Sequence, residues 1–349
     1  MRAGFGSGVM AEPLVSVIVI FLNAESFLAE AIASVEAQTL TRWELILVND
    51  GSTDGSAAIA HAAAKRDPLR VRSASHVDGE NRGMSASRNL GLYLSRTKYV
   101  AFLDGDDVWY PERLERHVEL LEAHVDCAIV AGPTEMWFSW VKTGENPSQD
   151  YVGREDSIRS LELPDGPVDP PHYLVDVLEE RAKTPAICSF TAQTRAVKFA
   201  GGFDEDFRGM FEDQVFFSKM LLRCRTWITT EVLDRYRQHP GSACYVARLQ
   251  GHYHGSPGNP DQRAFVERLE EFVAQQSETP PSLARALDRW RRRMQRPWRT
   301  LLGDAIHDPR RTMRMSLRFL ASKILPGRTY RRIWARAQGF DPRHDAPRD

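Results

Sequence analysis

The fold of this chain rests on the stretch Val15-Ser-Val-Ile-Val-Ile-Phe-Leu22, which is followed further on by Glu44-Leu-Ile-Leu-Val48. Both stretches are rich in β-branched and aliphatic residues with little polar alternation, as expected of parallel strands that are covered on both faces. A segment with helical spacing of apolar residues follows each of them, at 25–38 and at 54–65. The start of the chain therefore predicts β-α units and a parallel sheet.

The same alternation continues along the chain. The further elements that we expect are strands near 69–74, 99–103, 127–131 and 186–192 and helices near 83–95, 111–123 and 211–223. This order predicts an α/β fold with a mostly parallel sheet flanked by helices. Residues 134–184 interrupt the order with prolines and aromatic residues, so we expect a loop-rich insertion. Within it, Trp137, Trp140 and Tyr151 are candidate stacking surfaces, or else core residues.

The composition is that of a globular protein. Of 349 residues, 42% are hydrophobic and 27% are charged, which excludes disorder throughout. No apolar run approaches the roughly 18–20 residues that a membrane-spanning helix needs. Residues 1–13 lack an apolar core followed by a cleavage site, so we interpret them as a flexible lead rather than a signal peptide, and we expect a cytoplasmic location.

The net charge of -1 conceals two oppositely charged parts. Residues 285–336 hold 16 Lys and Arg against three acids, a net of +13, whereas residues 1–284 carry a net of -13. We therefore expect an α/β domain at 14–245 and a basic helical C-terminal extension at 246–349.

An apolar stripe between Met313 and Ile324 is flanked by arginines, which is typical of an interfacial helix. We favour contact with an anionic membrane surface through 285–336, at the inner face of the membrane. The alternatives are ordinary packing on the domain or on a second subunit, and nucleic-acid binding. No nucleic-acid-binding motif accompanies the charge, so we do not expect nucleic acid as a partner.

Polar side chains follow three of the expected strands. They are Asn23, Asp50 and the pair in Asp104-Gly-Asp106, and the carboxyl ends of parallel strands meet at one crevice. Two carboxylates at this spacing suit a hard divalent cation that also binds phosphates. The alternative is a turn whose Asp caps the helix that begins near Pro111.

Two further groups are candidates for chemistry. Glu212 and Asp213 begin the helix at 211–223, where the helix dipole stabilises carboxylates, so they are either functional or simply favourable first-turn acids. His239 lies past that helix and is either a metal or phosphate contact or a structural histidine. His252 and His254 have metal-like spacing but lack a third partner, which favours a solvated loop.

The order of these motifs resembles that of the family-2 glycosyltransferases over about residues 14–240. The resemblance is carried by Asn23, Val48-Asn-Asp-Gly-Ser-Thr-Asp54, Asn81-Arg-Gly-Met-Ser-Ala-Ser-Arg-Asn-Leu-Gly91, Phe102-Leu-Asp-Gly-Asp-Asp107, Gly201-Gly-Phe-Asp204 and Glu212-Asp213. It implies the nucleotide-sugar-binding GT-A fold, with the helical C-terminal extension added.

The resemblance also implies the site. A divalent cation, Mn²⁺ or Mg²⁺, would be held by Asp106 with Asp104 and His239, and would neutralise the charge on the leaving diphosphate. Asp213 would be the general base, supported by Glu212, in one inverting displacement. The residues expected to bind the nucleotide sugar are Asn23, Glu25, Asp50, Arg88 and Asp104. For Arg88, a helix-surface position is the alternative. With this function, we expect the insertion at 134–184 to shape the acceptor site.

The chain also departs from the family pattern. Leu22 stands where an aromatic residue often stacks on the base, and Phe21 faces the other side of its strand. Ala286-Leu-Asp-Arg-Trp290 lacks the Gln of the processive synthases, and no spanning helices are expected, which favours addition of a single sugar. With the resemblance, we expect a UDP-linked donor and a saccharide or lipid-linked hydroxyl as acceptor, in envelope glycan synthesis.

Two other classes of function stay open. A nucleotidyltransferase that forms sugar nucleotides would need a Gly-rich, Arg-bearing loop after the first strand, and Asn23-Ala-Glu-Ser-Phe27 is not one. A non-catalytic protein that binds nucleotide sugars would keep Asp50 without needing a base, so the presence of Asp213 argues against it.

Overall fold

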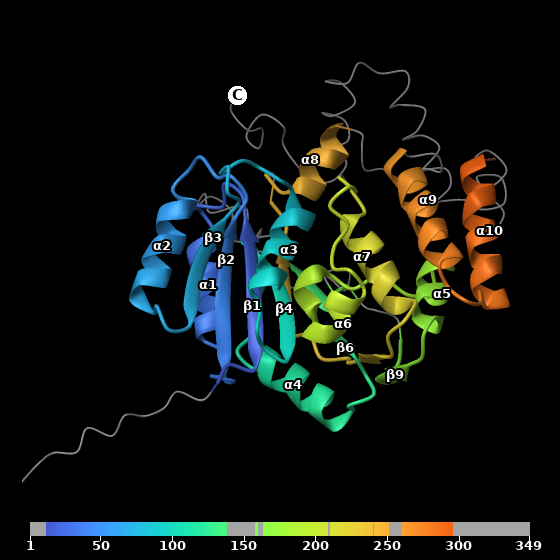
Figure 1. The fold of residues 1–349 in the computed structure, drawn as a ribbon, viewed down its shortest axis with the longest axis horizontal. Helices are drawn as coiled ribbons and strands as arrows, with labels where there is room; N and C mark the ends of the chain where they lie inside the picture. The colour runs from blue at the N-terminus through green and yellow to red at the C-terminus, as the bar shows by residue number, and fades with distance from the viewer. Residues whose placement is uncertain are drawn as a thin grey trace, which may run out of the picture.

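The computed structural model describes residues 12–137, 158–159, 163–208, 210–239, 241–250 and 260–295. These residues form a larger and a smaller β-sheet, with helices on both faces of the larger one (Figure 1). The strands of the larger sheet are, in spatial order, β3 (Val71–Ser75), β2 (Trp43–Asn49), β1 (Val15–Phe21), β4 (Tyr99–Asp104), β10 (Phe190–Gln193), β6 (Ile129–Ala131), β11 (Thr226–Ile228) and β9 (Gly166–Val168). Those of the smaller sheet are β5 (Val108–Trp109), β12 (Asp234–Arg237), β7 (Thr134–Trp137) and β8 (Ile158–Arg159).

The helices follow the strands in the predicted alternation. They are α1 (Leu28–Glu36), α2 (Ser56–Arg66), α3 (Met84–Leu94), α4 (Arg113–Ala123), α5 (His172–Leu178), α6 (Thr194–Phe199), α7 (Glu212–Leu221), α8 (Ala243–Gln250), α9 (Pro260–Ala274) and α10 (Pro281–Gln295). The strands and helices expected from the sequence are present, with ends that differ by a few residues. The prediction of an α/β fold with a mostly parallel sheet is confirmed.

β1 is central because both of its faces are covered. It pairs in parallel with β2 and β4, and all seven of its residues are buried. Val15, Val17 and Val19 belong to the hydrophobic cluster that includes α1, α2 and α4. Ile18 and Ile20 belong to the cluster on the other face, with α3, α6 and α7. This two-sided burial explains why the strand has no polar alternation.

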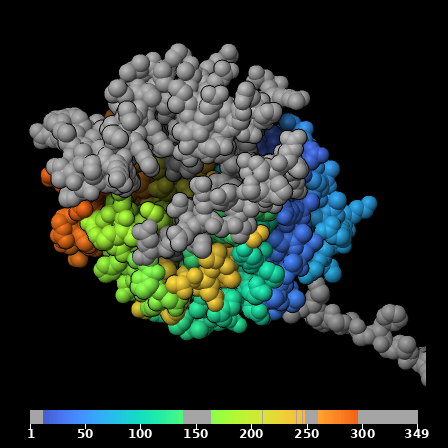
Figure 2. Space-filling model, turned by 180° about the vertical axis from the view of Figure 1, so that it is seen from behind, coloured from blue at the N-terminus to red at the C-terminus, as the bar shows by residue number. Residues whose placement is uncertain are grey.

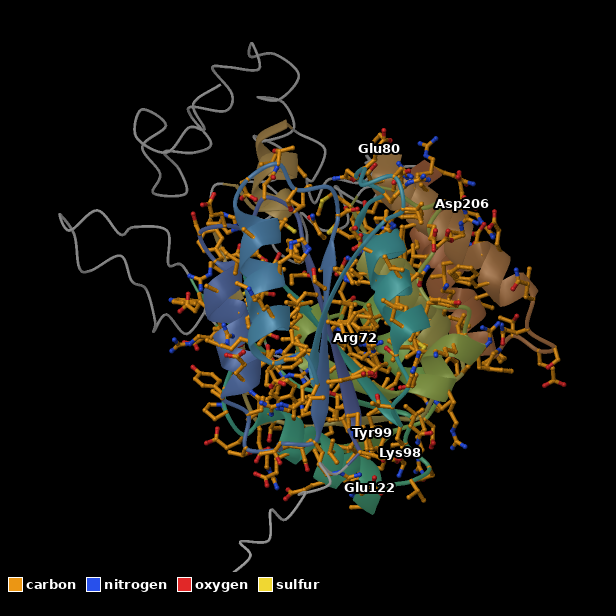
Figure 3. The ribbon with its side chains drawn as sticks, turned by 60° about the vertical axis from the view of Figure 1, so that its left-hand side comes forward. Arg72, Glu80, Lys98, Tyr99, Glu122 and Asp206 are labelled. Atoms are coloured by element: carbon orange, nitrogen blue, oxygen red, sulfur yellow. The ribbon has the colours of Figure 1, made fainter. Side chains whose placement is uncertain are left out.

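The sheet is not uniformly parallel, because β10 runs antiparallel to both of its neighbours, β4 and β6. In Figure 3, Lys98 and Tyr99, at the start of β4, lie with Glu122 at one end of the molecule, and Glu80 and Asp206 lie at the other end. The carboxyl ends of β1, β2 and β4 therefore point toward the end that carries Glu80 and Asp206.

The described parts of 134–184 contain more regular structure than expected. β7 pairs with β12, β9 forms an edge of the larger sheet, and α5 packs in the core through Tyr173 and Leu178. Trp137 ends β7, while Trp140 and Tyr151 lie outside the described residues.

α9 and α10 share the core of the α/β domain. Phe265 and Leu269 of α9 and Leu283 and Leu287 of α10 belong to the same hydrophobic cluster as Phe216 of α7. The space-filling view from behind shows the first β-α units, in blue, on one side of the described surface and α10, in orange, on the other (Figure 2).

Candidate functional site

The polar residues predicted at the strand ends lie at one edge of the sheet. Phe21 of β1 is opposite Asn49 of β2, and Ile20 is opposite Asp104 of β4. This register ends the three strands at nearly the same level. Asn23 and the acids that follow β2 and β4 therefore share the edge where ligands of such sheets bind.

Asn23 and Glu25 tie the end of β1 to the turn after β2. The side-chain oxygen of Asn23 accepts a hydrogen bond from the Thr53 N–H (2.8 Å), and the Glu25 carboxylate accepts one from the Gly55 N–H (3.0 Å). Asn23 has a φ of 49°, a left-handed conformation that Asn adopts more readily than most residues. Both side chains are exposed, so they border the strand-end edge on the solvent side.

Asp50 is buried and orders the connection into α3. Its carboxylate accepts hydrogen bonds from the backbone N–H groups of Arg82 (2.8 Å) and Gly83 (3.1 Å). His76 Nε2 lies 3.5 Å from Asp50 Oδ1 and 2.9 Å from the Ser87 hydroxyl. The sequence analysis missed His76, because no spacing in the sequence links it to Asp50.

The structure confirms that Phe21 cannot replace an aromatic residue at position 22. Phe21 is 3% exposed and belongs to the core on the α1 side of the sheet. Leu22 is 44% exposed at the end of β1. Neither side chain offers an aromatic ring to a nucleotide base at this position.

Arg88 joins the acid after β4 to the first turn of α7. It is 2% exposed, so the helix-surface alternative is wrong. Its guanidinium donates from Nη2 to Asp104 Oδ1 (2.7 Å) and from Nη1 to Glu212 Oε1. The Ser85 hydroxyl donates to the second oxygen of Glu212 (2.7 Å). A forked guanidinium suits this double contact, which lysine could not make in the same way.

The charges of this group affect one another. Burial by itself would lower the pKa of Arg88, but the carboxylates of Asp104 and Glu212 raise that pKa above its ordinary value. Burial raises the pKa of Asp104, which Arg88 lowers and the nearby carboxylates of Asp106 and Asp213 raise further. The negative charges of Asp106 and Asp213 therefore both act on Asp104.

Asp106 and His239 form a second contact at the same edge. His239 Nε2 lies 3.0 Å from Asp106 Oδ2, although 133 positions separate the two residues. Their side chains are 24% and 13% exposed. The His239 ring also packs on the ring of Phe27 at the start of α1, with centroids 4.5 Å apart.

Arg237 fixes β12 to the turn that carries Asp106. Its side chain is 3% exposed, its Nε donates to the backbone oxygen of Asp106 (2.6 Å), and its backbone N–H donates to Asp107 Oδ1 (2.8 Å). The guanidinium also lies 3.8 Å from the centroid of the Trp137 ring, so this tryptophan packs on Arg237. The sequence analysis missed Arg237, although it stands two residues before His239.

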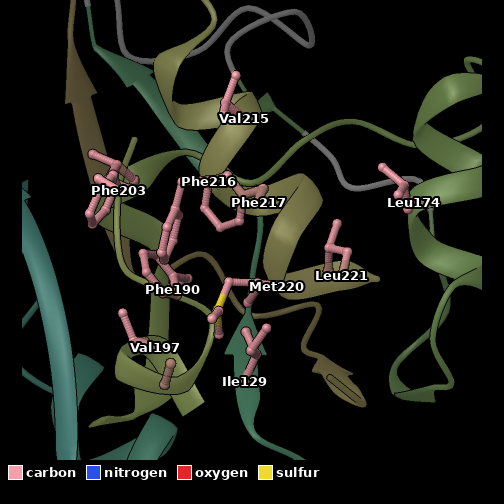
Figure 4. Packing of buried hydrophobic residues seen from close by; sticks show 14 of the residues in the cluster. Ile129, Leu174, Phe190, Val197, Phe203, Val215, Phe216, Phe217, Met220 and Leu221 are labelled. Atoms are coloured by element: carbon pink, nitrogen blue, oxygen red, sulfur yellow. The ribbon is translucent and has the colours of Figure 1, made fainter. Parts of the chain in front are cut away.

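Asp213 lies in the first turn of α7, as predicted, and is partly buried. Its Oδ1 accepts a hydrogen bond from the Gln214 N–H (2.8 Å). The apolar side of α7 packs in the core, where Phe216 stacks on Phe203 with ring centroids 3.9 Å apart (Figure 4). This packing fixes the helix on the sheet while its N-terminus stays at the strand-end edge.

The side chains at this edge of the sheet provide only part of the ligands that a divalent cation needs. Asp106 and His239 offer an oxygen and a nitrogen in direct contact, which are ligand types that Mn²⁺ accepts. Asp104 is engaged with Arg88. Within the described ranges no group of three or more His, Cys, Asp or Glu side chains is arranged to hold a metal ion. The residues present fit a cation that takes its remaining ligands from a bound diphosphate and water.

The described part of the basic segment packs on the domain. Leu283, Ala286, Leu287 and Met294 of α10 are buried, and the Trp290 indole N–H donates to the backbone oxygen of Leu178 in α5. The arginines of α10 pair with acids, as in Arg289–Glu179, Arg291–Glu270, Arg292–Asp288 and Arg293–Glu180. The apolar face of α10 therefore packs on the domain, which is one of the alternatives given above. Contact of 285–336 with a membrane stays a prediction, and the stripe from Met313 to Ile324 lies outside the described residues. No helix in the described ranges has the length and hydropathy of a membrane span.

Comparison with known proteins agrees with this geometry. The model of the family "Glycosyl transferase family 2" matches residues 16–169, which contain β1, β2, β4 and the acids that follow them. This segment belongs to glycosyltransferase family 2. The resemblance inferred from the sequence is confirmed.

Curated relatives share this family-2 segment. The chain is 44% identical over 110 residues to the uncharacterized glycosyltransferase EpsJ of Bacillus subtilis, covering 32% of this chain and 31% of EpsJ. It is 39% identical over 112 residues to the putative teichuronic acid biosynthesis glycosyltransferase TuaG of the same organism, covering 32% of this chain and 42% of TuaG. The match thus spans about a third of the curated relatives' length.

Solved structures share the fold more widely. TarS 1–349 of S. aureus in complex with UDP has a TM-score of 0.57 at 18% identity, covering 82% of this chain and 73% of that one. The mannosyltransferase PcManGT of Pyrobaculum calidifontis, in complex with GDP-Man and Mn²⁺, has a TM-score of 0.54 at 16% identity, covering 93% of this chain and 85% of that one. The family-2 segment therefore lies in a GT-A fold.

Proposed function

We propose that the protein transfers one sugar from a nucleotide-sugar donor, of the UDP-linked class, to a hydroxyl of a saccharide or lipid-linked acceptor, with inversion, in envelope glycan synthesis. The observation that carries the proposal is the bridge from Asp104 through Arg88 to Glu212. It joins the acids at the end of β4 to the helix turn of Asp213. Donor and acceptor chemistry can meet in the space between them.

The residues that we propose to bind the nucleotide-sugar donor are Asn23, Glu25, Asp50, Asp104 and Asp106. Asp50 would accept from the base, since a carboxylate has acceptor sites beyond the backbone N–H groups that it already binds. The complexes of TarS with UDP and with UDP-GlcNAc support a UDP-linked donor. Arg88 would act on the donor indirectly, by holding Asp104, because its guanidinium is bound to two carboxylates.

The residues that we propose to hold a metal ion are Asp106 and His239. A divalent cation, Mn²⁺ or Mg²⁺, would when bound neutralise the charge that builds on the leaving diphosphate. Arg237 would keep His239 beside Asp106 by clamping the Asp106 backbone. The Mn²⁺ in the PcManGT complex supports a divalent metal.

On the acceptor side, Asp213 would take the proton of the attacking hydroxyl, and Glu212 would hold the first turn of α7 through Arg88 and Ser85. A single displacement needs one base and no covalent intermediate, so the product anomer is inverted.

The packing of α10 affects which residues of the basic segment 285–336 we propose to contact a membrane. α10 uses its apolar face within the domain, and its Arg289 and Arg293 pair with Glu179 and Glu180. Residues 296–336 still hold 11 Lys and Arg against two acids, a net of +9. We therefore assign contact with an anionic inner membrane surface, where a lipid-linked acceptor would lie, to these residues.

The expected result of a thermal-shift panel is a metal-dependent preference for UDP compounds. UDP and UDP-GlcNAc with Mn²⁺ should raise the melting temperature more than GDP or GDP-Man, because a ligand at 100 times its Kd stabilises the folded state by about 2.7 kcal/mol. Asp106→Asn should lose the Mn²⁺-dependent part of the shift.

Glu122→Gln is the matched control, because it makes the same acid-to-amide change at the opposite end of the molecule (Figure 3). It should keep the full shift. Equal shifts with and without Mn²⁺ in the wild type, or no shift with any nucleotide, would contradict the proposal.

A further inference from the structure

Phe211, which directly precedes α7, has a backbone conformation that aromatic residues rarely adopt. Its φ of 78° and ψ of 10° lie in the left-handed region, where the Cβ of an L-residue crowds the backbone. Such a conformation persists only where the surrounding structure holds it. Asp213 follows two residues later, so the angles at Phe211 set how the chain enters the helical turn that carries Asp213.

The contacts that hold Phe211 come from the C-terminal helices. Its ring is 8% exposed and stacks on Phe265 of α9, with centroids 5.9 Å apart and planes 21° apart. Phe265 in turn meets Trp290 of α10 edge to face, with centroids 6.2 Å apart. The Trp290 indole N–H donates to the backbone oxygen of Leu178 (2.6 Å). A continuous set of contacts therefore runs from α5 through α10 and α9 to the residue before α7.

α9 also contacts the start of the segment that leads from Asp204 to Phe211. Arg268 Nε lies 3.2 Å from Asp204 Oδ2. The other oxygen of Asp204 accepts hydrogen bonds from the N–H groups of Asp206 (3.1 Å) and Phe207 (3.3 Å). One face of α9 therefore contacts both ends of the connection that leads from Asp204 to Phe211.

We propose that α9 and α10 position the general base, with Phe265 and Trp290 as positioning residues that act through Phe211. They hold the strained backbone before α7, so that Asp213 faces the acceptor hydroxyl. This inference rests on the proposed function, which makes Asp213 the base. Both helices lie outside residues 16–169, which match the family, so the C-terminal part of this chain contributes to the geometry of the site.

The test compares two changes in α9 of the full chain. Phe265→Ala should lower kcat by about 10- to 100-fold, because a misplaced catalytic group costs about that much. KM for the donor should stay within about twofold, since Asp50 and Asp106 are not touched. The UDP- and Mn²⁺-dependent thermal shift should also stay the same. Phe265→Leu, which keeps most of the bulk but not the ring, should lower kcat by only several-fold.

Val273→Ala is the control, because it removes a buried side chain from the same helix about two turns further on. It should lower the melting temperature and leave kcat within about twofold. Normal kcat in Phe265→Ala, or an equal loss of kcat in Val273→Ala, overturns the inference. If Phe265→Ala does not fold, Phe265→Leu decides: a several-fold lower kcat with an unchanged thermal shift supports the inference, and wild-type kcat overturns it. Asp213→Asn is measured alongside, and near-normal transfer by that variant refutes the base assignment itself, whatever Phe265 does.

Discussion

Asp213→Asn should abolish sugar transfer while leaving the fold and the nucleotide site intact. A general base contributes about 10²- to 10⁴-fold, so kcat should fall by that factor. The Asn side chain has the same shape and keeps an oxygen that can accept the Gln214 N–H, as Asp213 Oδ1 does. It cannot accept the proton of the attacking hydroxyl. The measurement is the rate of sugar transfer at saturating donor, together with the UDP- and Mn²⁺-dependent thermal shift.

Asp206→Asn is the matched control for this prediction. Asp206 is an exposed acid at the same end of the molecule (Figure 3), so it receives the same change of charge without a place in the proposed chemistry. It should retain wild-type kcat and the wild-type thermal shift. Near-normal transfer by Asp213→Asn would refute the assignment of the base.

Arg88→Met should lower both the free energy of unfolding and the affinity for the nucleotide donor. The change leaves the carboxylates of Asp104 and Glu212 without their shared cation, and breaking a buried ion pair costs about 3–5 kcal/mol. The free energy of unfolding from urea titration should fall by about that amount. The UDP-dependent thermal shift should fall too, because Asp104 loses its orientation.

Comparing the single and the double variant separates the effect of the uncompensated carboxylates from the effect of lost packing. Glu212→Gln in the Arg88→Met background removes one of the two uncompensated charges, so the double variant should be more stable than Arg88→Met alone. Arg88→Lys should recover only part of the stability, because an ammonium group cannot bridge both carboxylates as a guanidinium does. A loss below about 1 kcal/mol in Arg88→Met would mean that the bridge contributes little.

The strand-end geometry could be predicted from sequence because it depends on local patterns. The apolar run at 15–22 specifies a two-sided buried strand, and the acids after β2 and β4 follow at positions fixed by the ends of the strands. Parallel pairing in register then brings them together without further information. The first turn of α7 was predictable for the same reason, from an amphipathic helix with acids at its start.

The partners of the buried arginines could not be predicted in this way. Arg88 meets Glu212 across 124 positions of the chain, and nothing in the periodicity of α3 marks this arginine as buried. The same holds for Arg237, whose stacking partner Trp137 was interpreted as a possible acceptor surface. The first pair depends on how α3 and α7 pack beside each other, and the second on the pairing of β12 with β7. A pattern within one segment contains neither.

α10 shows what a count of charges does not specify. The basic charge of 285–336 predicted contact with a membrane or packing on the domain, but it does not say which of the two applies to each part of the segment. In the structure the apolar side chains of α10 belong to the core, and its arginines pair with Glu179 and Glu180 of the turn after α5 and with Glu270 of α9. Those acids are distant in sequence, so the net charge of +13 over 285–336 does not reveal these pairs.

The most direct test of the central claim is sugar transfer itself. The wild-type protein is incubated with Mn²⁺, with UDP-GlcNAc or whichever nucleotide sugar gives the largest thermal shift, labelled in the sugar, and with a bacterial envelope fraction that supplies saccharide and lipid-linked acceptors. We predict that the label moves into the acceptor fraction, that the transfer needs Mn²⁺, and that Asp213→Asn abolishes it. Label that stays in the nucleotide sugar despite Mn²⁺-dependent binding would contradict the account in favour of a non-catalytic binding protein. In a parallel incubation with added pyrophosphate, label released as sugar phosphate would contradict it in favour of a nucleotidyltransferase.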